Sequence, residues 1–136
     1  SYHGSYHQFT LAGINPRPTK PVPIWFGGGA PALLDRCARL GDGWLPVTGP
    51  GKRAEAAIES MRQTRESMGL SWESFGIHAQ VQADGGTPES WQKSYKEWQK
   101  LGATDLSIAT HNAGLKSVDE HLEVLETWLG VVTKDT

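Results

Sequence analysis

The chain alternates short apolar runs with segments of helical period, and this alternation constrains the fold more than any other feature. Four times, a run of strand length is followed by a helix-length segment that ends near a glycine. The pattern predicts strands over 23–26, 43–47, 75–83 and 106–109, and helices over 31–40, 52–68, 88–101 and 118–129. Serial units of this kind produce parallel strands with right-handed crossovers, so the predicted fold class is α/β.

The local signals differ in strength along the chain. Residues 75–83 alternate apolar and polar side chains and are the clearest strand, whereas Pro46 weakens the strand before it. Thr87 is a typical N-cap of a helix, and Ser117 with Glu120 has the spacing of a capping box. The last helix is predicted to bury an apolar seam of Val118, Leu122, Leu125 and Leu129.

Four βα units are half of a TIM-type (β/α)₈ barrel, which takes about 250 residues. The chain has 136 residues, and we expect an irregular arm over 1–21 followed by a single half-barrel domain over 22–136. An open half-barrel would expose two strand edges and an apolar inner face, which folded proteins generally cover. We therefore expect a homo-oligomer or a separate N-terminal half as partner.

Charge and hydropathy exclude some partners. The net charge is −2 and the Lys and Arg residues are scattered, whereas nucleic-acid binding usually needs a concentrated basic face. No apolar stretch approaches the ~20 residues that span a bilayer, and no leader pattern opens the chain, so we expect a cytoplasmic location without membrane contact. The single cysteine, Cys37, is expected to be a buried, unreactive thiol.

The first strand ends in the glycine run Gly27-Gly28-Gly29-Ala30, directly before a helix. Glycines let a backbone approach a ligand closely, and the N–H groups at a helix N-terminus favour a phosphate. The run is neither a Walker loop nor a dinucleotide-binding fingerprint, so a simple glycine-rich connection is the alternative.

The second strand ends at Val47-Thr48-Gly49, which would lie beside the glycine run if the two strands are neighbours. The Thr48 hydroxyl and the Gly49 N–H could then bind the same anion. An ordinary turn is the alternative interpretation, because Gly49 is followed by Pro50 and Gly51.

Among the histidines, His111 follows the fourth strand, at the edge where parallel α/β proteins carry their sites. It is a candidate general acid or base, with a solvated loop histidine as the alternative. His78 is expected to form a structural hydrogen bond, and His121 to lie on the surface. His3 and His7 lack nearby acidic ligands, so no metal site is predicted.

Other residues receive structural assignments. Asp42 precedes a strand and is assigned to turn geometry at the opposite end of the sheet. The aromatic residues Tyr2, Tyr6 and Phe9 of the arm are either a lid over a flat ligand or part of a flexible terminus.

Several stretches together resemble one family. They are Tyr6-His7-Gln8-Phe9, Pro16-Arg17-Pro18, Pro21-Val22-Pro23-Ile24-Trp25-Phe26-Gly27-Gly28-Gly29 and Arg39-Leu40-Gly41-Asp42-Gly43-Trp44-Leu45-Pro46. In this order they resemble the C-terminal half of the bacterial luciferase-like monooxygenase family, particularly its deazaflavin-dependent branch. The resemblance implies a (β/α)₈ barrel that uses FMN or coenzyme F420 to oxidise a small-molecule substrate by hydride transfer or oxygen insertion.

The resemblance also implies which residues hold the cofactor. In similar members the loops after the fifth and sixth strands bind its phosphate tail, and these roles would fall to Gly27, Gly28, Gly29, Ala30, Val47, Thr48 and Gly49. Nothing in the chain corresponds to the first four strands, which supply much of the isoalloxazine pocket. The main alternative is a non-catalytic half-barrel dimer that acts as a phosphate-ligand binding or assembly module. A phosphosugar enzyme with the same glycine loop is a weaker one.

Overall fold

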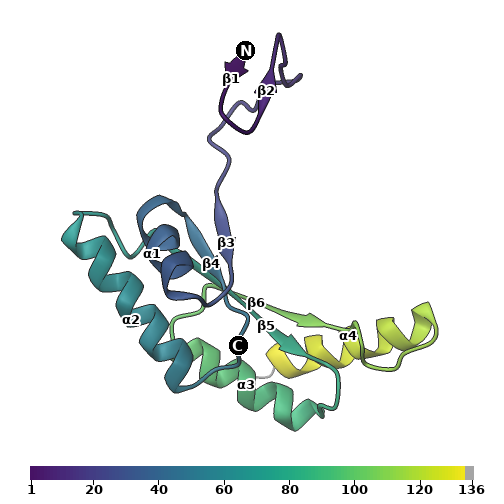
Figure 1. Cartoon of the computed structure of the whole chain (residues 1–136). Helices are drawn as coiled ribbons and strands as arrows, with labels where there is room; N and C mark the ends of the chain where they lie inside the picture. Colours follow the sequence, from purple (N-terminus) through teal and green to yellow (C-terminus); the bar gives the residue numbers. More distant parts are fainter. Residues whose placement is uncertain (134–136) are drawn as a thin grey trace.

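A computed structural model describes residues 1–133, and the last three residues of the predicted 22–136 domain lie outside the described residues. Four parallel strands form one sheet in the order β3-β4-β5-β6, and a helix follows each strand (Figure 1). The strands are β3 (Trp25–Gly27), β4 (Gly43–Leu45), β5 (Gly76–Gln82) and β6 (Asp105–Ala109), and the helices are α1 (Pro31–Leu40), α2 (Lys52–Ser67), α3 (Pro88–Lys100) and α4 (Val118–Val132). The predicted α/β class with four serial βα units is confirmed.

The predicted boundaries agree with the structure to within two residues at most ends. Two ends show the clearest differences. Strand β4 ends at Leu45 rather than at residue 47, because Pro46 has no N–H to donate to a neighbouring strand. Helix α4 continues to Val132, three residues beyond the last member of the apolar seam that predicted it.

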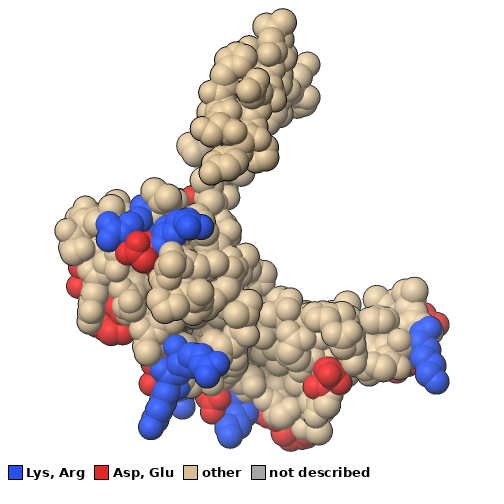
Figure 2. All heavy atoms as spheres, viewed as in Figure 1, with Lys and Arg blue, Asp and Glu red and all other residues tan. Residues whose placement is uncertain are grey.

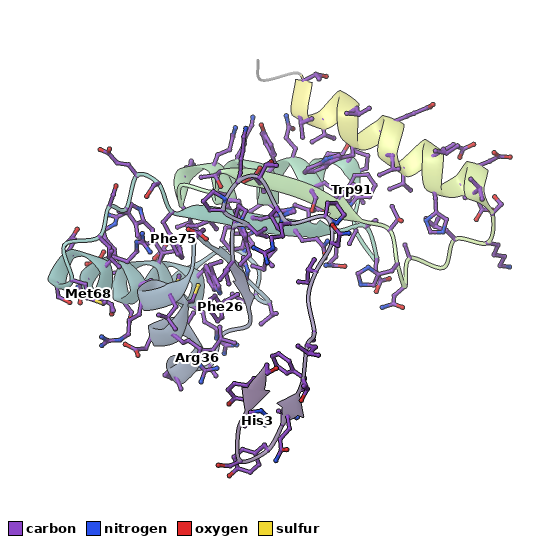
Figure 3. The ribbon with its side chains drawn as sticks, turned by 90° about the horizontal axis from the view of Figure 1, so that it is seen from above. His3, Phe26, Arg36, Met68, Phe75 and Trp91 are labelled. Carbon is purple, nitrogen blue, oxygen red and sulfur yellow. The ribbon has the colours of Figure 1, made fainter. Side chains whose placement is uncertain are left out.

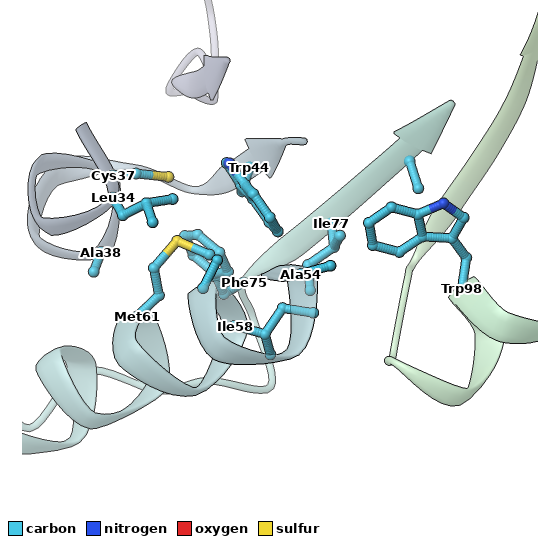
Figure 4. Close-up of a cluster of buried hydrophobic side chains, with 12 residues drawn as sticks. Leu34, Cys37, Ala38, Trp44, Ala54, Ile58, Met61, Phe75, Ile77 and Trp98 are labelled. Atoms are coloured by element: carbon cyan, nitrogen blue, oxygen red, sulfur yellow. The ribbon is translucent and has the colours of Figure 1, made fainter. Parts of the chain in front are cut away.

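The main core lies between the sheet and helices α1, α2 and α3. Trp44 and Ile77 point from the strands into this layer, and Met61 and Trp98 enter it from the helices (Figure 4). All four of these side chains are at most 2% exposed. A second, smaller cluster joins the carboxyl end of β5 to α3 and α4 around Trp91 and Trp128. The helices therefore cover one face of the sheet, as in half of a barrel.

The opposite face of the sheet is open and more polar than expected. Gln80 and Gln82 of β5 are exposed on it, and the His78 Nε2 atom lies 3.0 Å from the Ser107 Oγ atom. Trp25 lies edge-on to His78, over Gly43 and Gly76, where any Cβ atom would collide with its ring. The expectation of an apolar inner face is wrong for β5, because its outward positions alternate with buried Ile77, Ala79 and Val81.

The arm is more regular than predicted. β1 (Tyr2–His3) and β2 (Gln8–Phe9) pair as a small antiparallel hairpin, so the expectation of a wholly irregular arm is wrong at these residues. The Tyr2 and Phe9 rings stack across the pair with centroids 5.7 Å apart. The hairpin stands away from the sheet and helices at the end of an extended segment (Figure 1), and its visible face carries no Lys, Arg, Asp or Glu side chain (Figure 2).

Helix α4 does not bury the seam predicted for it. Val118, Leu122, Leu125 and Leu129 are between 40% and 74% exposed. The face that packs carries Trp128 and Val131, which are buried, and the partly buried Val124. Both faces of α4 are apolar, and α3 covers only one of them, so periodicity alone could not choose between them.

Candidate functional site

The glycine run forms the tight loop that connects β3 to α1. Gly28 has φ +131°, a conformation that other residues rarely adopt, and a Cβ atom there would approach Leu33 to 2.9 Å. The Gly28 N–H donates to the Leu45 carbonyl at 3.2 Å, and the Trp44 Nε1–H donates to the Gly28 carbonyl at 2.7 Å. The backbone N–H and C=O groups of Gly28 therefore both form hydrogen bonds with residues of β4, which hold the turn against that strand.

The two predicted loops meet around one cavity. It has a volume of about 590 Å³, and Gly29 and Ala30 from the first loop and Val47 and Thr48 from the second line it. A Cβ atom on Gly29 would lie 3.8 Å from the Val47 side chain, so the loops are in van der Waals range. Gly27 and Gly28 do not line this cavity, and Gly49 lines a different one.

The cavity is suited to an anion. Ala30 is the N-cap of α1 and Pro31 its first residue, so the positive end of the helix dipole faces the cavity. Within the described residues, the N–H groups of Gly29, Ala30 and Ala32 have no hydrogen-bond acceptor. These donors are therefore available to a ligand.

Arg53 adds a positive charge that the sequence reasoning missed. It lies in the first turn of α2 and lines the same cavity, together with Ser60 from a later turn. The sequence did contain an indication that Arg53 could lie near the anion site, because Arg53 follows the second loop closely and lies at the start of a predicted helix. Its neighbour Lys52 is equally basic, so only the fold shows which of the two lines the cavity.

His111 is not part of this arrangement. It lies in an exposed turn after β6, and β6 and β3 are opposite edges of the sheet, so His111 is far from the glycine run. The histidine that does contact the end of β6 is His121 of α4, whose Nδ1 atom lies 2.7 Å from the Thr110 Oγ1 atom. His121 is half-buried, so its predicted surface position is wrong.

The remaining assignments are largely confirmed. The His78–Ser107 contact is the structural hydrogen bond predicted for His78. The Ile24 N–H donates to Asp42 Oδ2 at 2.8 Å, at the amino-terminal edge of the sheet where a turn residue was expected. Cys37 is fully buried, and burial raises the pKa of its thiol to about 11.

Two further findings concern the described residues as a whole. No group of three or more His, Cys, Asp or Glu side chains gathers in a way that could hold a metal ion within residues 1–133. In the same range, no helix is both long enough and apolar enough to cross a membrane.

Comparison with known proteins agrees with the resemblance. An uncharacterized protein of Mycobacterium tuberculosis is 32% identical over 107 residues, which cover 79% of this chain and 35% of that protein. An F420-dependent glucose-6-phosphate dehydrogenase of Kineococcus radiotolerans is 30% identical over 71 residues, covering 51% of this chain and 21% of the enzyme. The chain therefore spans about a third or less of the length of these relatives.

A solved structure shares the fold. The coenzyme F420-dependent tetrahydromethanopterin reductase of Methanopyrus kandleri superposes with a TM-score of 0.60 at 13% identity, over 78% of this chain and 50% of that one. The luciferase-like monooxygenase family matches residues 1–112, which contain the hairpin arm, the glycine run, the second loop and strands β3 to β6. The chain belongs to the luciferase-like monooxygenase family.

Proposed function

We propose that the chain is the C-terminal half of a flavin- or deazaflavin-dependent oxidoreductase or monooxygenase, and that it holds the phosphate end of the cofactor. The observation that carries this proposal is the cavity where Gly29, Ala30 and Thr48 meet Arg53. One positive side chain, a helix N-terminus and unpaired N–H groups form a donor set for a phosphate. The F420-dependent relatives favour F420 as the cofactor, and FMN is the alternative.

Each residue of the site has a distinct role in this proposal. Gly29 and Ala30 donate backbone N–H groups to the phosphate, Thr48 donates its hydroxyl, and Arg53 supplies the compensating charge. Gly27 and Gly28 shape the turn, and Gly49 ends the second loop. The cofactor would supply hydride or oxygen chemistry toward a small-molecule substrate, with further groups from the other half of the barrel. The protein would work in the cytoplasm, and His111 stays only a candidate acid or base.

Cofactor binding by the purified chain tests the proposal. We expect FMN or F420 to bind saturably, as followed by cofactor fluorescence, and inorganic phosphate to compete. Gly29→Asp should weaken binding by about tenfold or more, because a carboxylate would enter the anion cavity. Gly29→Ala is the matched control, because its Cβ atom makes only an ordinary contact with Val47. Absence of saturable binding by both cofactors would contradict the assignment.

A second candidate function is a non-catalytic half-barrel dimer that binds a phosphate ligand or serves in assembly. The exposed seam of α4 favours it, because four aliphatic side chains in a row are rarely left uncovered. This function predicts a stable dimer in sedimentation that binds phosphate but shows no redox turnover. Turnover by the dimer with either cofactor would exclude this candidate.

A further inference from the structure

The sheet opens between β4 and β5 at its carboxyl end. Pairing between these strands stops at Trp44 and Ile77, whereas β5 and β6 stay paired up to Gln82 and Ala109. The Leu45 carbonyl accepts from Gly28, on the β3 side. The next residue, Pro46, therefore faces β5, and it has no N–H with which to continue the ladder.

Unpaired backbone groups of β5 border this opening. The Ile77 carbonyl accepts from the Thr104 N–H, and the Ala83 N–H donates to the Ala109 carbonyl, so the odd-numbered residues of β5 face β6. Because backbone direction alternates along a strand, Gln80 and Gln82 face the other way, toward the opening. Their N–H and C=O groups lie beyond the last residue pair of β4 and β5.

A cavity of about 570 Å³ fills the opening. The loop after β4, the carboxyl half of β5 and the first turns of α3 line it, and its polar side chains are Thr48, Gln80, Gln82, Asp84, Ser90 and Ser94. The Gln82 Nε2 atom donates to Gln80 Oε1 at 3.2 Å, which leaves the Gln80 amide N–H₂ and the Gln82 amide oxygen facing other partners. The cavity thus presents donors and acceptors together.

A buried donor in the cavity wall lacks a partner. Trp91 of α3 is 6% exposed, and its Nε1 atom makes no hydrogen bond within the described residues. Buried indole N–H groups usually find an acceptor, because leaving one unpaired is unfavourable. Trp91 lies away from the α1 and α2 side of the sheet, where Arg36 and Met68 are found (Figure 3).

The glycine turn before α3 lies against the indole nitrogen of Trp91. The Nε1 atom lies against Gly86, where any Cβ atom would collide with it, and Gly85 has φ +62°. Both Gly86 and Trp91 line the cavity. A ligand hydroxyl would therefore reach Nε1 through a small displacement of this glycine turn.

The charge in the cavity selects the class of ligand. Asp84 is the only charged side chain among its lining residues, so an anion is disfavoured. A hydroxyl group both donates and accepts, and so can pair with amides, hydroxyls, strand edges and an indole N–H. We propose that the opening between β4 and β5 binds a neutral, hydroxyl-rich small molecule, a polyol or an unphosphorylated sugar, with one hydroxyl accepting from Trp91 Nε1–H.

This site is separate from the anion cavity beside the glycine run. Val47 and Thr48 form a shared wall, with Arg53 on one side and Asp84 on the other. The two cavities therefore differ in charge, and loss of anion binding by Gly29→Asp should leave polyol binding intact.

Titration of the full chain with ribitol, followed by ¹H–¹⁵N NMR, tests the proposal. We expect the Trp91 indole and Gly86 amide signals to shift saturably with ribitol and to stay unchanged with inorganic phosphate. Trp91→Phe should weaken ribitol binding by about fivefold, the value of one hydrogen bond. Trp128→Phe replaces another buried tryptophan, outside the cavity, and should leave the affinity unchanged.

A second variant covers the case in which Trp91→Phe unfolds the chain, as judged by circular dichroism. Gln82→Leu removes an exposed amide that lines the cavity and should weaken ribitol binding to a similar extent. The proposal is wrong if ribitol produces no saturable shift, if phosphate competes for the same signals, or if the folded variants retain full affinity.

Discussion

At the scale of single residues, Cys37 shows how burial determines chemistry. Its Sγ atom lies 3.4 Å from the Gly43 carbonyl in the main core. Burial raises the pKa of the thiol from 9.0 to about 11, against smaller lowering effects from the Phe26 backbone and the Arg65 charge. The thiolate is the reactive form, so Cys37 should be inert in the folded chain.

This shift predicts a pH dependence of stability. Between pH 9.0 and about 11 the unfolded chain has lost the Cys37 proton while the folded chain keeps it. The free energy of unfolding should therefore be lowered as the pH rises through this window, and be unaffected by Cys37 below it. Urea denaturation at several pH values measures this effect, with Cys37→Ala as the control. Equal slopes for the two proteins above pH 9.0 would contradict the prediction.

Arg65 predicts a large effect on stability. Its guanidinium donates to the carbonyls of Ala38, Gly41 and Ser71 at 2.8–3.1 Å and lies over the Phe75 ring. Arg65→Met leaves these buried carbonyls without donors and should cost about 3 kcal/mol in the free energy of unfolding.

The Arg65 prediction has two matched comparisons. Arg65→Lys keeps the charge but lacks the planar fork, so it should recover part of the loss. Arg36→Met removes an exposed arginine of α1 and should change the free energy of unfolding by no more than about 0.5 kcal/mol. A loss for Arg65→Met as small as that of the control, measured by urea denaturation, would show that the contacts are weak.

At the scale of elements, Pro46 decides where β4 stops pairing. Pro46→Ala supplies the missing N–H, so we expect the ladder between β4 and β5 to extend and the opening beside it to narrow. Amide hydrogen exchange at residues 80 and 82 should slow, and the amide introduced at position 46 should be protected from exchange. Pro50→Ala lies in the same loop beyond the strand and should leave those rates unchanged. Unaltered exchange in the Pro46 variant would mean that packing, not proline, separates the strands.

Element positions and boundaries were largely predictable, because apolar period, caps and glycine stops are local signals. Thr87 accepts from the Ser90 N–H and Ser117 accepts from the Glu120 N–H, as capping residues do. Which face of α4 is buried was not predictable, because this depends on the elements that pack against the helix. The hairpin of the arm was missed because strands of two residues carry no periodicity.

At the scale of the whole molecule, two sheet edges and one helix face lack a partner within the described residues. β3 and β6 are edge strands, and the seam of α4 lies beyond β6 in the chain. Uncovered edges and apolar stripes favour association. A second copy of the chain, or further strands of a barrel, would cover these features.

The seam predicts the effect of charged variants on association. If copies of the chain dimerise through α4, the double variant Leu122→Glu and Leu125→Glu should sediment as a monomer at concentrations where the unmodified chain is a dimer. Its thermal stability as a monomer should change little, because both side chains are at least 40% exposed. Leu40→Glu changes an exposed position of α1 and is the control, so this variant should stay dimeric. A dimeric double variant would place the interface elsewhere.

The sequence alone determined the order of elements, the parallel sheet and the place of the glycine loop, because each depends on residues close together in the chain. Only the tertiary structure brought Arg53 to Gly29, separated His111 from the glycine run, and turned the seam of α4 outward. Those outcomes depend on which strands become neighbours and on which face of a helix a neighbour covers. Spacing along the chain does not encode either property locally.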